Sequence, residues 1–315
     1  MGWGPGERLR VVELFAGGGG SAQGLREAGD VEHVALYEVD KYCVATLRAN
    51  GFDTTHQVDV REVDFAECGG CDLLVAGVPC QPFSAANARA AGEQDRRNGW
   101  PHALRALREL QPACFVFENV AGLLRDSFRD FFGRILAEIE AAGYVVHTRL
   151  LRAVEHGMAQ TRRRVFLVGF RDAAAADRFQ WPAPEPGPPT VRSVVGNLGP
   201  PLADDDGALR HFFHAGARQY RGHNPSRPDG PARTVLAGTS GCDGGNNTYL
   251  PPDGELRYFT VREVARLQTF PDSYRFPGSW TQAFKQIGNA VPPRLMRLLA
   301  AQLREAMRHQ KKRCV

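Results

Sequence analysis

Short apolar runs alternate with helical stretches through the first 170 residues of the chain. The first run, LRVVELFA at residues 9–16, ends in four glycines, and a helix is expected from Ser21, a candidate N-cap, to Ala28. Further strand-like runs fall at residues 33–37, 73–77, 114–118, 144–151 and 165–170, with helical spacing at 41–50, 103–110 and 128–142. Strands that alternate with helices in this way predict an α/β fold built on a parallel sheet.

The alternation stops at a proline-rich segment. Residues 182–189 contain five prolines, which predicts a stiff linker and a domain boundary. Residues 190–256 are rich in Gly, Pro, Asn, Asp and Arg, and the helical pattern returns after Thr260. We therefore expect an α/β domain at residues 1–180, completed by 281–315, and a smaller loop-rich domain at 181–280.

Composition adds few constraints. Hydrophobic residues make up 43% and charged residues 23%, the net charge is +4, and no apolar run is long enough to span a membrane. The N-terminus lacks the pattern of a signal peptide, and seven scattered cysteines are typical of reduced thiols. The CxxC pair at residues 68–71 has no second pair to complete a zinc site. These features predict a cytoplasmic protein that binds no metal.

Polar residues follow the predicted strands at the edge where α/β proteins bind their ligands. The turn of Gly17 to Gly20 suits close approach of a ligand to a helix N-terminus, although a plain tight turn would explain it nearly as well. Glu38 ends the second strand about 20 residues later, where an acidic side chain can bind ribose hydroxyls, and Asp59 follows the third. Together they favour a cofactor that contains adenosine.

Cys80 follows another of these strands. It lies between Pro79 and Pro82 in a loop that leaves the carboxyl edge of the sheet. Such rigid placement beside a cofactor turn favours a nucleophilic thiol, while a buried inert cysteine is the alternative.

A carboxylate and two arginines complete the candidate chemistry. Glu118 lies at the tip of the strand at 114–118, where partial burial would raise its pKa and let it donate a proton to a ring nitrogen; a capping glutamate is the alternative. Arg162 and Arg164 immediately precede a strand with alternate spacing. They could donate to a base carbonyl and a phosphate, or form a solvated basic edge.

These segments resemble, in order along the chain, the motifs of the cytosine-C5 DNA methyltransferases of prokaryotic restriction-modification systems. The matching segments are ELFAGGGG at 13–20, GVPCQPFS at 77–84, FENV at 117–120, QTRRR at 160–164, RTV at 233–235 and QIGNAVPP at 286–293. One departure is Glu13, where the family more often has aspartate, which would shift the local cofactor contacts.

The resemblance implies a Rossmann-like S-adenosylmethionine-dependent methyltransferase sheet. It also implies transfer of a methyl group to C5 of a cytosine flipped out of double-stranded DNA, with S-adenosylhomocysteine as product. In this reading Cys80 attacks C6, Glu118 acts at N3, and Arg162 and Arg164 hold the base and its backbone. The implied cofactor-binding residues are Phe15, Ala16, Gly17, Gly19, Gly20, Glu38, Val39, Asp59, Val60, Pro79, Asn289 and Val291.

The loop-rich domain corresponds in position to the family's target-recognition domain. Its arginines would act as placed contacts, because residues 181–280 hold ten arginines and ten acidic residues. The expected DNA contacts are Gln81, Ser84, Arg218, Arg221, His223, Asn224, Arg227 and Arg233. We expect a monomer, with a restriction endonuclease that recognises the same site as a candidate partner.

Three alternatives remain open. A relative that methylates cytosine in tRNA would keep the chemistry and change the substrate. A nicotinamide-dependent oxidoreductase could use a similar sheet, but the imperfect glycine fingerprint and the Cys80 loop argue against it. A catalytically inactive DNA-binding relative is disfavoured by the presence of Cys80, Glu118, Arg162 and Arg164.

Overall fold

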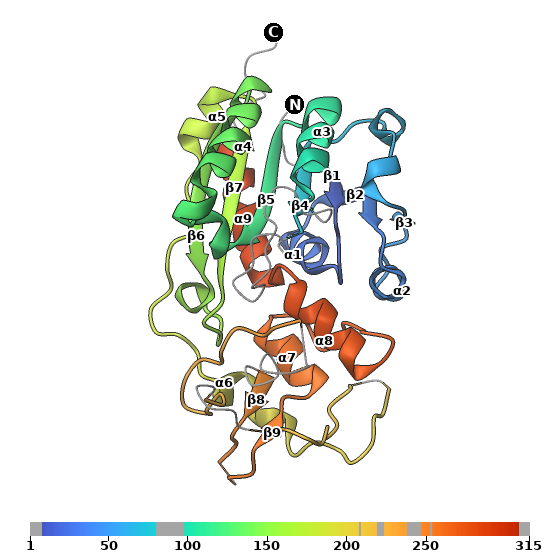
Figure 1. Cartoon of the computed structure of the whole chain (residues 1–315), viewed down its shortest axis with the longest axis vertical. Helices are drawn as coiled ribbons and strands as arrows, with labels where there is room; N and C mark the ends of the chain where they lie inside the picture. Colours follow the sequence, from blue (N-terminus) through green and yellow to red (C-terminus); the bar gives the residue numbers. More distant parts are fainter. Residues whose placement is uncertain are drawn as a thin grey trace.

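A seven-stranded sheet forms the centre of the molecule (Figure 1). The computed structural model describes residues 8–79, 98–207, 209–218, 224–237, 247–252 and 254–308. The sheet has the order β3-β2-β1-β4-β5-β7-β6. Its strands are β1 (Leu9–Leu14), β2 (Val31–Glu38), β3 (Thr55–Gln57), β4 (Leu73–Gly77), β5 (Cys114–Val120), β6 (Val145–Arg152) and β7 (Arg163–Phe170).

The predicted α/β class is confirmed, with one difference in strand direction. Strands β1 to β5 are parallel, whereas β7 runs antiparallel to both β5 and β6. The connection between β6 and β7 contains only a 3-10 turn, Ala153–His156, before β7 begins at Arg163. A parallel pair needs a crossover of a dozen or more residues, so this short connection returns the chain as an antiparallel neighbour.

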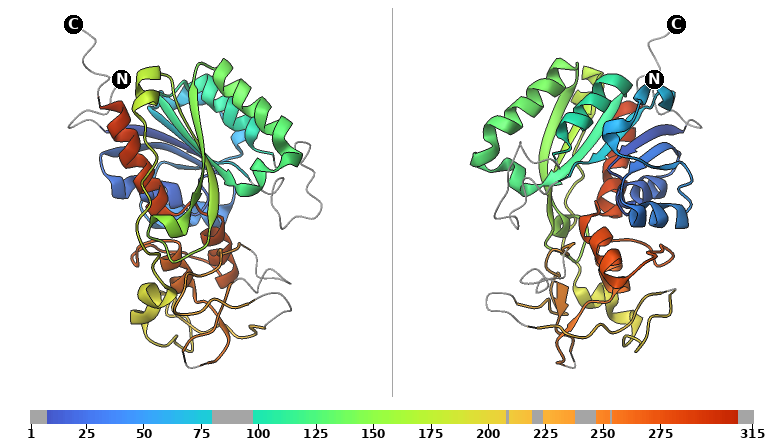
Figure 2. Two further views of the ribbon diagram at one scale, coloured as in Figure 1. Left: turned by 90° about the vertical axis from the view of Figure 1, so that its left-hand side faces the viewer. Right: turned by 45° about the vertical axis from the view of Figure 1, so that its right-hand side comes forward.

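Helices cover both faces of the sheet (Figure 2). One face packs against α1 (Gly20–Ala28), α5 (Ala173–Arg178) and α9 (Pro293–Met307), and the other against α3 (Trp100–Leu110) and α4 (Arg129–Ala141). The alternation of side chains along a strand produces this division: Val11 of β1 belongs to the first core and Val12 to the second. Helix α2 (Lys41–Ala49) follows β2.

A third core joins the sheet-bearing part to the segment after the proline-rich linker. It combines Ala16 and Leu47 with residues of α6 (Val191–Val195), α7 (Val261–Leu267) and α8 (Trp280–Asn289). The small hairpin of β8 (Thr248–Tyr249) and β9 (Arg257–Tyr258) lies in this lower part of the molecule (Figure 1). The predicted domain limits stay a prediction; α8 begins at Trp280, next to the expected boundary.

One local prediction was wrong. The first helix begins at Gly20, and its N-cap is Gly19, in the left-handed conformation with φ of 80°, instead of Ser21. The Ser21 side chain forms a hydrogen bond with the Glu13 side chain of β1 and therefore does not cap the helix.

Arg162, just before β7, joins the sheet-bearing part of the molecule to the segment after the proline-rich linker through its buried guanidinium. The side chain is 1% exposed, and its Nη1 donates to the carbonyl oxygen of Val235 at 3.2 Å. Its Nη2 donates to the carbonyl oxygens of Gly288 and Ala290, each at 2.9 Å. Hydrogen bonds from a charged donor to buried carbonyls are stronger than neutral ones, so this side chain fixes the end of α8 against the sheet.

Two glutamines extend the same buried seam. Gln160 Nε2 donates to Gln268 Oε1 at 2.8 Å, and Gln268 Nε2 donates to the Ala290 carbonyl oxygen at 2.7 Å. Gln160 Oε1 accepts the backbone N–H of Val235 at 3.0 Å. The seam thus joins β7, the loop-rich segment and the link between α8 and α9.

Replacing Arg162 by methionine tests this tie. The substitution removes the donor from buried carbonyls, so we expect the free energy of unfolding to fall by about 3 kcal/mol or more. The control Arg171→Met removes an exposed guanidinium that donates to the Gln111 carbonyl oxygen, and should cost about 0.5 kcal/mol or less. Urea unfolding followed by fluorescence measures both, and equal small losses would contradict the role given to Arg162.

Candidate active site

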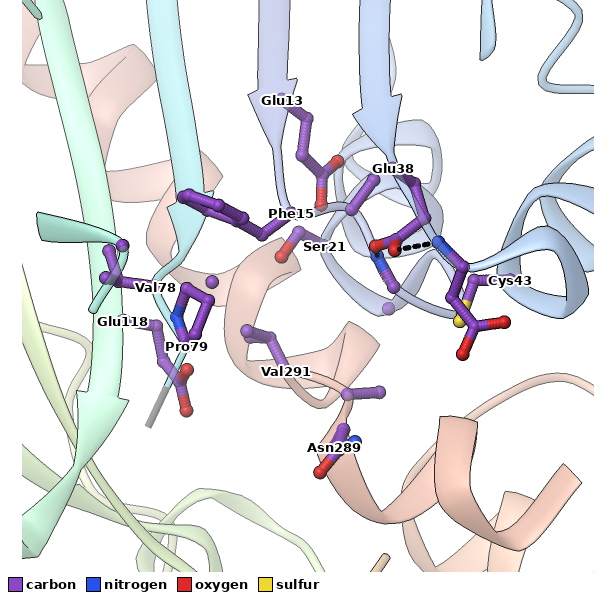
Figure 3. Close-up of a pocket in the computed structure, with 18 of the residues that line it drawn as sticks. Glu13, Phe15, Ser21, Glu38, Cys43, Val78, Pro79, Glu118, Asn289 and Val291 are labelled. Atoms are coloured by element: carbon purple, nitrogen blue, oxygen red, sulfur yellow. Dashed lines mark hydrogen bonds between the residues drawn. The ribbon is translucent and has the colours of Figure 1, made fainter. Parts of the chain in front are cut away.

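A cavity of about 420 Å³ opens at the carboxyl ends of β1, β2, β4 and β5 (Figure 3). Ten of the twelve residues predicted to bind a cofactor line it: Phe15, Ala16, Gly17, Gly20, Glu38, Val39, Asp59, Pro79, Asn289 and Val291. Gly19 and Val60 do not line it. Glu118 and Arg164 also lie in its wall, so one cavity holds the predicted cofactor residues and part of the predicted catalytic set.

The glycine turn is shaped by the C-terminal segment that packs on it. A Cβ atom at Gly20 would lie 2.0 Å from the Val291 carbonyl oxygen, and one at Gly19 would lie 2.3 Å from Tyr274 Oη. Gly19 therefore contacts the protein and not the cavity. The Tyr274 hydroxyl donates to the Gly18 carbonyl oxygen at 2.8 Å. Glycine is required here because the turn is pressed between β1 and residues far along the chain.

Glu38 organises the opposite side of the cavity. Its Oε2 accepts the Gly17 N–H at 2.7 Å, and its Oε1 accepts the N–H groups of Val39 and Asp40, each at 2.8 Å. Burial raises the pKa of this carboxyl, and the three N–H donors oppose that shift. The side chain thus connects the turn after β1 with the turn after β2.

Glu118 and Arg164 form a buried ion pair at the other end of the cavity. Glu118 lies on β5 and Arg164 on β7, and Arg164 Nε is 2.7 Å from Glu118 Oε1. Burial raises the pKa of Glu118, while the nearby charges of Arg164 and Arg162 lower it. A carboxyl group whose pKa is raised by burial can carry a proton and donate it inside the cavity.

The structure does not bring Arg162 into the cavity. Its charge lies close enough to Glu118 to influence the carboxyl, but its guanidinium donates to the backbone carbonyl oxygens of Val235, Gly288 and Ala290. This placement differs from the substrate contact that the spacing of Arg162 and Arg164 predicted. We therefore treat Arg162 as a positioning residue.

The predicted nucleophile, Cys80, lies outside the described residues, as do Gln81 and Ser84. The chain that leads to them is described: β4 ends at Gly77, and Val78 is buried while Pro79 forms part of the cavity wall. Figure 3 shows Pro79 beside Glu118. The described part of the chain thus reaches the cavity wall at Pro79.

The predicted DNA contacts of the loop-rich segment lie away from the cavity. Arg218, Asn224 and Arg227 are exposed, and Arg233 is half-buried. None of these four lines the cavity, and Arg221 and His223 lie outside the described residues. Their contact with DNA stays a prediction.

Sequence reasoning missed several cavity residues, including an ion pair. Lys285 Nζ of α8 lies 2.9 Å from Asp40 Oδ2, at the N-cap of α2, and both residues line the cavity. His102 of α3 lies there too, and burial together with Arg105 and Arg61 lowers its pKa. No local pattern marks residues that come together from 245 positions apart.

The sequence singled out Glu13 as a departure from the family motif but did not predict its burial and its unpartnered oxygen. It is 2% exposed, lines the cavity, and its Oε2 has no hydrogen-bond partner among the described residues. Burial raises its pKa to about 8, the Ser21 hydroxyl opposes the shift, and Glu38 adds to it. A buried oxygen without a partner beside a cavity is available to a ligand.

The family of the chain follows from comparison with known proteins. The seven-stranded sheet, with helices on both faces, has a Rossmann-like fold that solved methyltransferase structures share. A family model described as C-5 cytosine-specific DNA methylase matches residues 9–226 and 215–305. The chain belongs to this family and is a DNA (cytosine-5-)-methyltransferase.

Relatives cover nearly the whole chain. Type II methyltransferase M.NlaX of Neisseria lactamica is 32% identical over 95% of this chain and 97% of its own length. Type II methyltransferase M.AplI of Arthrospira platensis is 32% identical over 97% of this chain and 88% of its own.

Solved structures share the fold at lower identity. The Entamoeba histolytica methyltransferase EhMeth has a TM-score of 0.74 at 14% identity, covering 94% of this chain and 98% of its own. A mutant of Spodoptera frugiperda DNMT2 has a TM-score of 0.72 at 19% identity, covering 94% and 99%.

The cavity fits the cofactor that this family uses, S-adenosylmethionine. The carboxylates of Glu38 and Asp59 are acceptors for hydroxyl or amino groups, Phe15 offers an apolar ring, and the unpartnered oxygen of Glu13 suits a polar or cationic group. Among the described residues, no cluster of three or more His, Cys, Asp or Glu side chains could hold a metal ion. Within the same residues, no helix is long and apolar enough to cross a membrane.

Glu13→Gln tests the protonation of this carboxyl. The folded pKa of about 8 exceeds the unfolded value of 4.5, so between these values the folded state binds more protons. Wild-type stability should therefore fall by a few kcal/mol as pH rises from about 5 to 8 because of Glu13, and the variant should lack this fall.

The control for this experiment is Glu32→Gln, at an exposed position of β2. Urea unfolding at pH 5, 6.5 and 8 compares the three proteins. A Glu13→Gln variant with the same pH dependence as wild type and the control would show that Glu13 is ionised in the folded protein.

Proposed function

We propose that this DNA (cytosine-5-)-methyltransferase transfers the methyl group of S-adenosylmethionine to C5 of a cytosine that is flipped out of a short specific DNA site. We further propose a covalent bond between Cys80 and C6 of that base. The observation that carries the proposal is that the Glu118–Arg164 pair lies in the same cavity as the glycine turn and Glu38. A cofactor held by the turn and a base held by the pair would then face each other.

The cofactor would occupy the side of the cavity formed by β1 and β2. Glu38 and Asp59 would accept hydrogen bonds from its hydroxyl and amino groups, and Phe15 would contact its apolar parts. When bound, S-adenosylmethionine supplies an activated methyl group. The turn of Gly17 to Gly20 permits close approach because no side chain occupies it.

The target base must leave the duplex to reach this cavity. Extruding a nucleotide costs a few kcal/mol of unstacking and unpairing, which contacts inside the protein must offset. The Glu118 carboxyl, with its pKa raised by burial, would donate a hydrogen bond or a proton to N3 of the cytosine. Arg164, whose Nε lies beside that carboxyl, would position the Glu118 carboxyl relative to the base.

The covalent steps balance through Cys80. Its thiolate would add to C6, and the protonated N3 would take up the electron density of the ring. The electron pair of the resulting C4=C5 enamine would then bond to the methyl carbon as the bond from that carbon to the sulfonium sulfur breaks, so that S-adenosylhomocysteine leaves. Loss of the C5 proton to a base and departure of the Cys80 thiolate from C6 would restore the aromatic ring.

The loop-rich segment would select the DNA site. Its exposed residues Arg218, Asn224 and Arg227 are candidates for contacts to bases and phosphates. We propose that the enzyme acts as a monomer. The relatives named as Type II methyltransferases support a restriction-modification role, with an endonuclease that recognises the same site.

Bisulfite sequencing of DNA from cells that express the protein tests the substrate. We expect protected cytosines confined to one short sequence, because the recognition segment is compact. Expression of soluble protein with every cytosine converted would sink the DNA assignment, and labelling of tRNA in the same cells would indicate the RNA alternative.

Glu118→Gln tests the proton donor. Glutamine keeps the size of the side chain but cannot donate a proton to N3, so kcat should fall by about 100- to 10,000-fold. The dissociation constant for S-adenosylmethionine, measured by calorimetry, should stay within about twofold. Glu155→Gln, in the 3-10 turn between β6 and β7 and outside the cavity lining, is the matched control. Near-normal kcat in Glu118→Gln would exclude acid catalysis by this residue.

A further inference from the structure

Three consecutive arginines precede and begin β7, and only the middle one lacks a role so far. Arg162 is buried in the seam, and Arg164 pairs with Glu118. Arg163 is exposed, and its guanidinium has no hydrogen bond or ion pair with any residue that the structure describes. An exposed arginine beside two fixed ones is free to contact a partner.

A second arginine lies directly opposite on the neighbouring strand. Arg152 of β6 is the cross-strand partner of Arg163 in the antiparallel pair. The Arg152 side chain is 56% exposed, and its recorded ion pair is a long one, 3.7 Å to Glu155 Oε1. Like charges directly opposite each other destabilise a sheet, so this arrangement favours an anion bound between the two guanidinium groups.

Both arginines lie on the face of the sheet that packs against α3 and α4. Alternation along the strands puts Arg163 on the same face as Val165, and Arg152 on the same face as Leu150. Val165 belongs to the core under α3 and α4, and Leu150 packs against that core. Val78, which precedes the nucleophile loop, belongs to that core as well. The next residue along β7, Arg164, lines the cavity, with its side chain on the opposite face of the sheet.

The pair also lies where the sheet meets the loop-rich segment. The Thr161 N–H donates to the Ala232 carbonyl oxygen at 2.8 Å, two residues before Arg163. The lower ends of β6 and β7 point toward the loop-rich part in Figure 1. Duplex DNA that contacts the loop-rich segment while its flipped-out nucleotide enters the cavity must pass near this junction.

We propose that Arg152 and Arg163 together bind one backbone phosphate of duplex DNA close to the target nucleotide. The inference rests on the proposed DNA substrate and assigns two residues to its backbone. Arginine suits this role because its planar guanidinium matches the geometry of a phosphate. The contact carries no sequence information, since every nucleotide presents the same phosphate.

The test uses a mixed-sequence DNA duplex and the full-length protein. Neutralising one phosphate contributes about −0.9 to the slope of log K against log salt concentration. Arg152→Gln/Arg163→Gln should therefore bind more weakly at low salt, with a slope smaller by about 1, and each single variant should fall between. Arg152→Lys/Arg163→Lys keeps both charges and should keep most of the slope.

Arg308→Gln is the matched control. It removes the same charge from an exposed arginine that pairs with Glu305 at the end of α9. Its slope should equal that of wild type. The melting temperature of the double glutamine variant should be unchanged or raised, because like-charge repulsion is removed, and its dissociation constant for S-adenosylmethionine should not change.

The outcomes separate this inference from the proposed function. An enzyme that methylates DNA, yet shows the same salt slope in wild type, double variant and control, overturns the phosphate contact alone. A wild-type protein that methylates no DNA overturns the proposed function, whatever its slope. A double variant that melts well below wild type would assign the pair to folding and also overturn the inference.

Discussion

The buried guanidinium of Arg162, together with the third hydrophobic core, joins the sheet to the loop-rich segment and to α8. It joins the start of β7 to Val235 in the loop-rich segment and to Gly288 and Ala290 at the end of α8. Val291, the next residue, packs its carbonyl oxygen against Gly20 at the start of α1. One charged side chain therefore helps to fix the glycine turn, although it does not line the cavity.

The chemistry of the cavity arises from three buried carboxyl groups in different surroundings. Glu38 accepts three backbone N–H groups and holds two turns together. Glu118 faces an arginine, and Glu13 has one oxygen without a partner among the described residues. Burial raises the pKa of all three, but only the surroundings decide which group is structural, which can donate a proton, and which is available to a ligand.

The sequence predicted what depends on local pattern and on the edge rule for α/β sheets. The apolar runs located most strands, and the rule that ligands bind at their carboxyl ends brought Phe15, Glu38, Asp59 and Glu118 to one cavity. The sequence could not predict that Arg162 is buried and bonded to backbone carbonyl oxygens, because alternate spacing gives the direction of a side chain and not its partners. The Lys285–Asp40 pair was missed because its members are distant in sequence, and the direction of β7 depends on how its connection packs.

The proposed attack of Cys80 on C6 of the target base can be tested directly with a covalent trap. Duplex DNA containing 5-fluorocytosine carries a fluorine that cannot leave C5 as a proton does, so the thiolate cannot depart after methyl transfer. With S-adenosylmethionine present, we expect a stable protein–DNA adduct that peptide mass spectrometry assigns to Cys80 and that carries the transferred methyl group. Methylation of ordinary cytosine in DNA without any adduct on the fluorinated duplex, or an adduct on another residue, would contradict it.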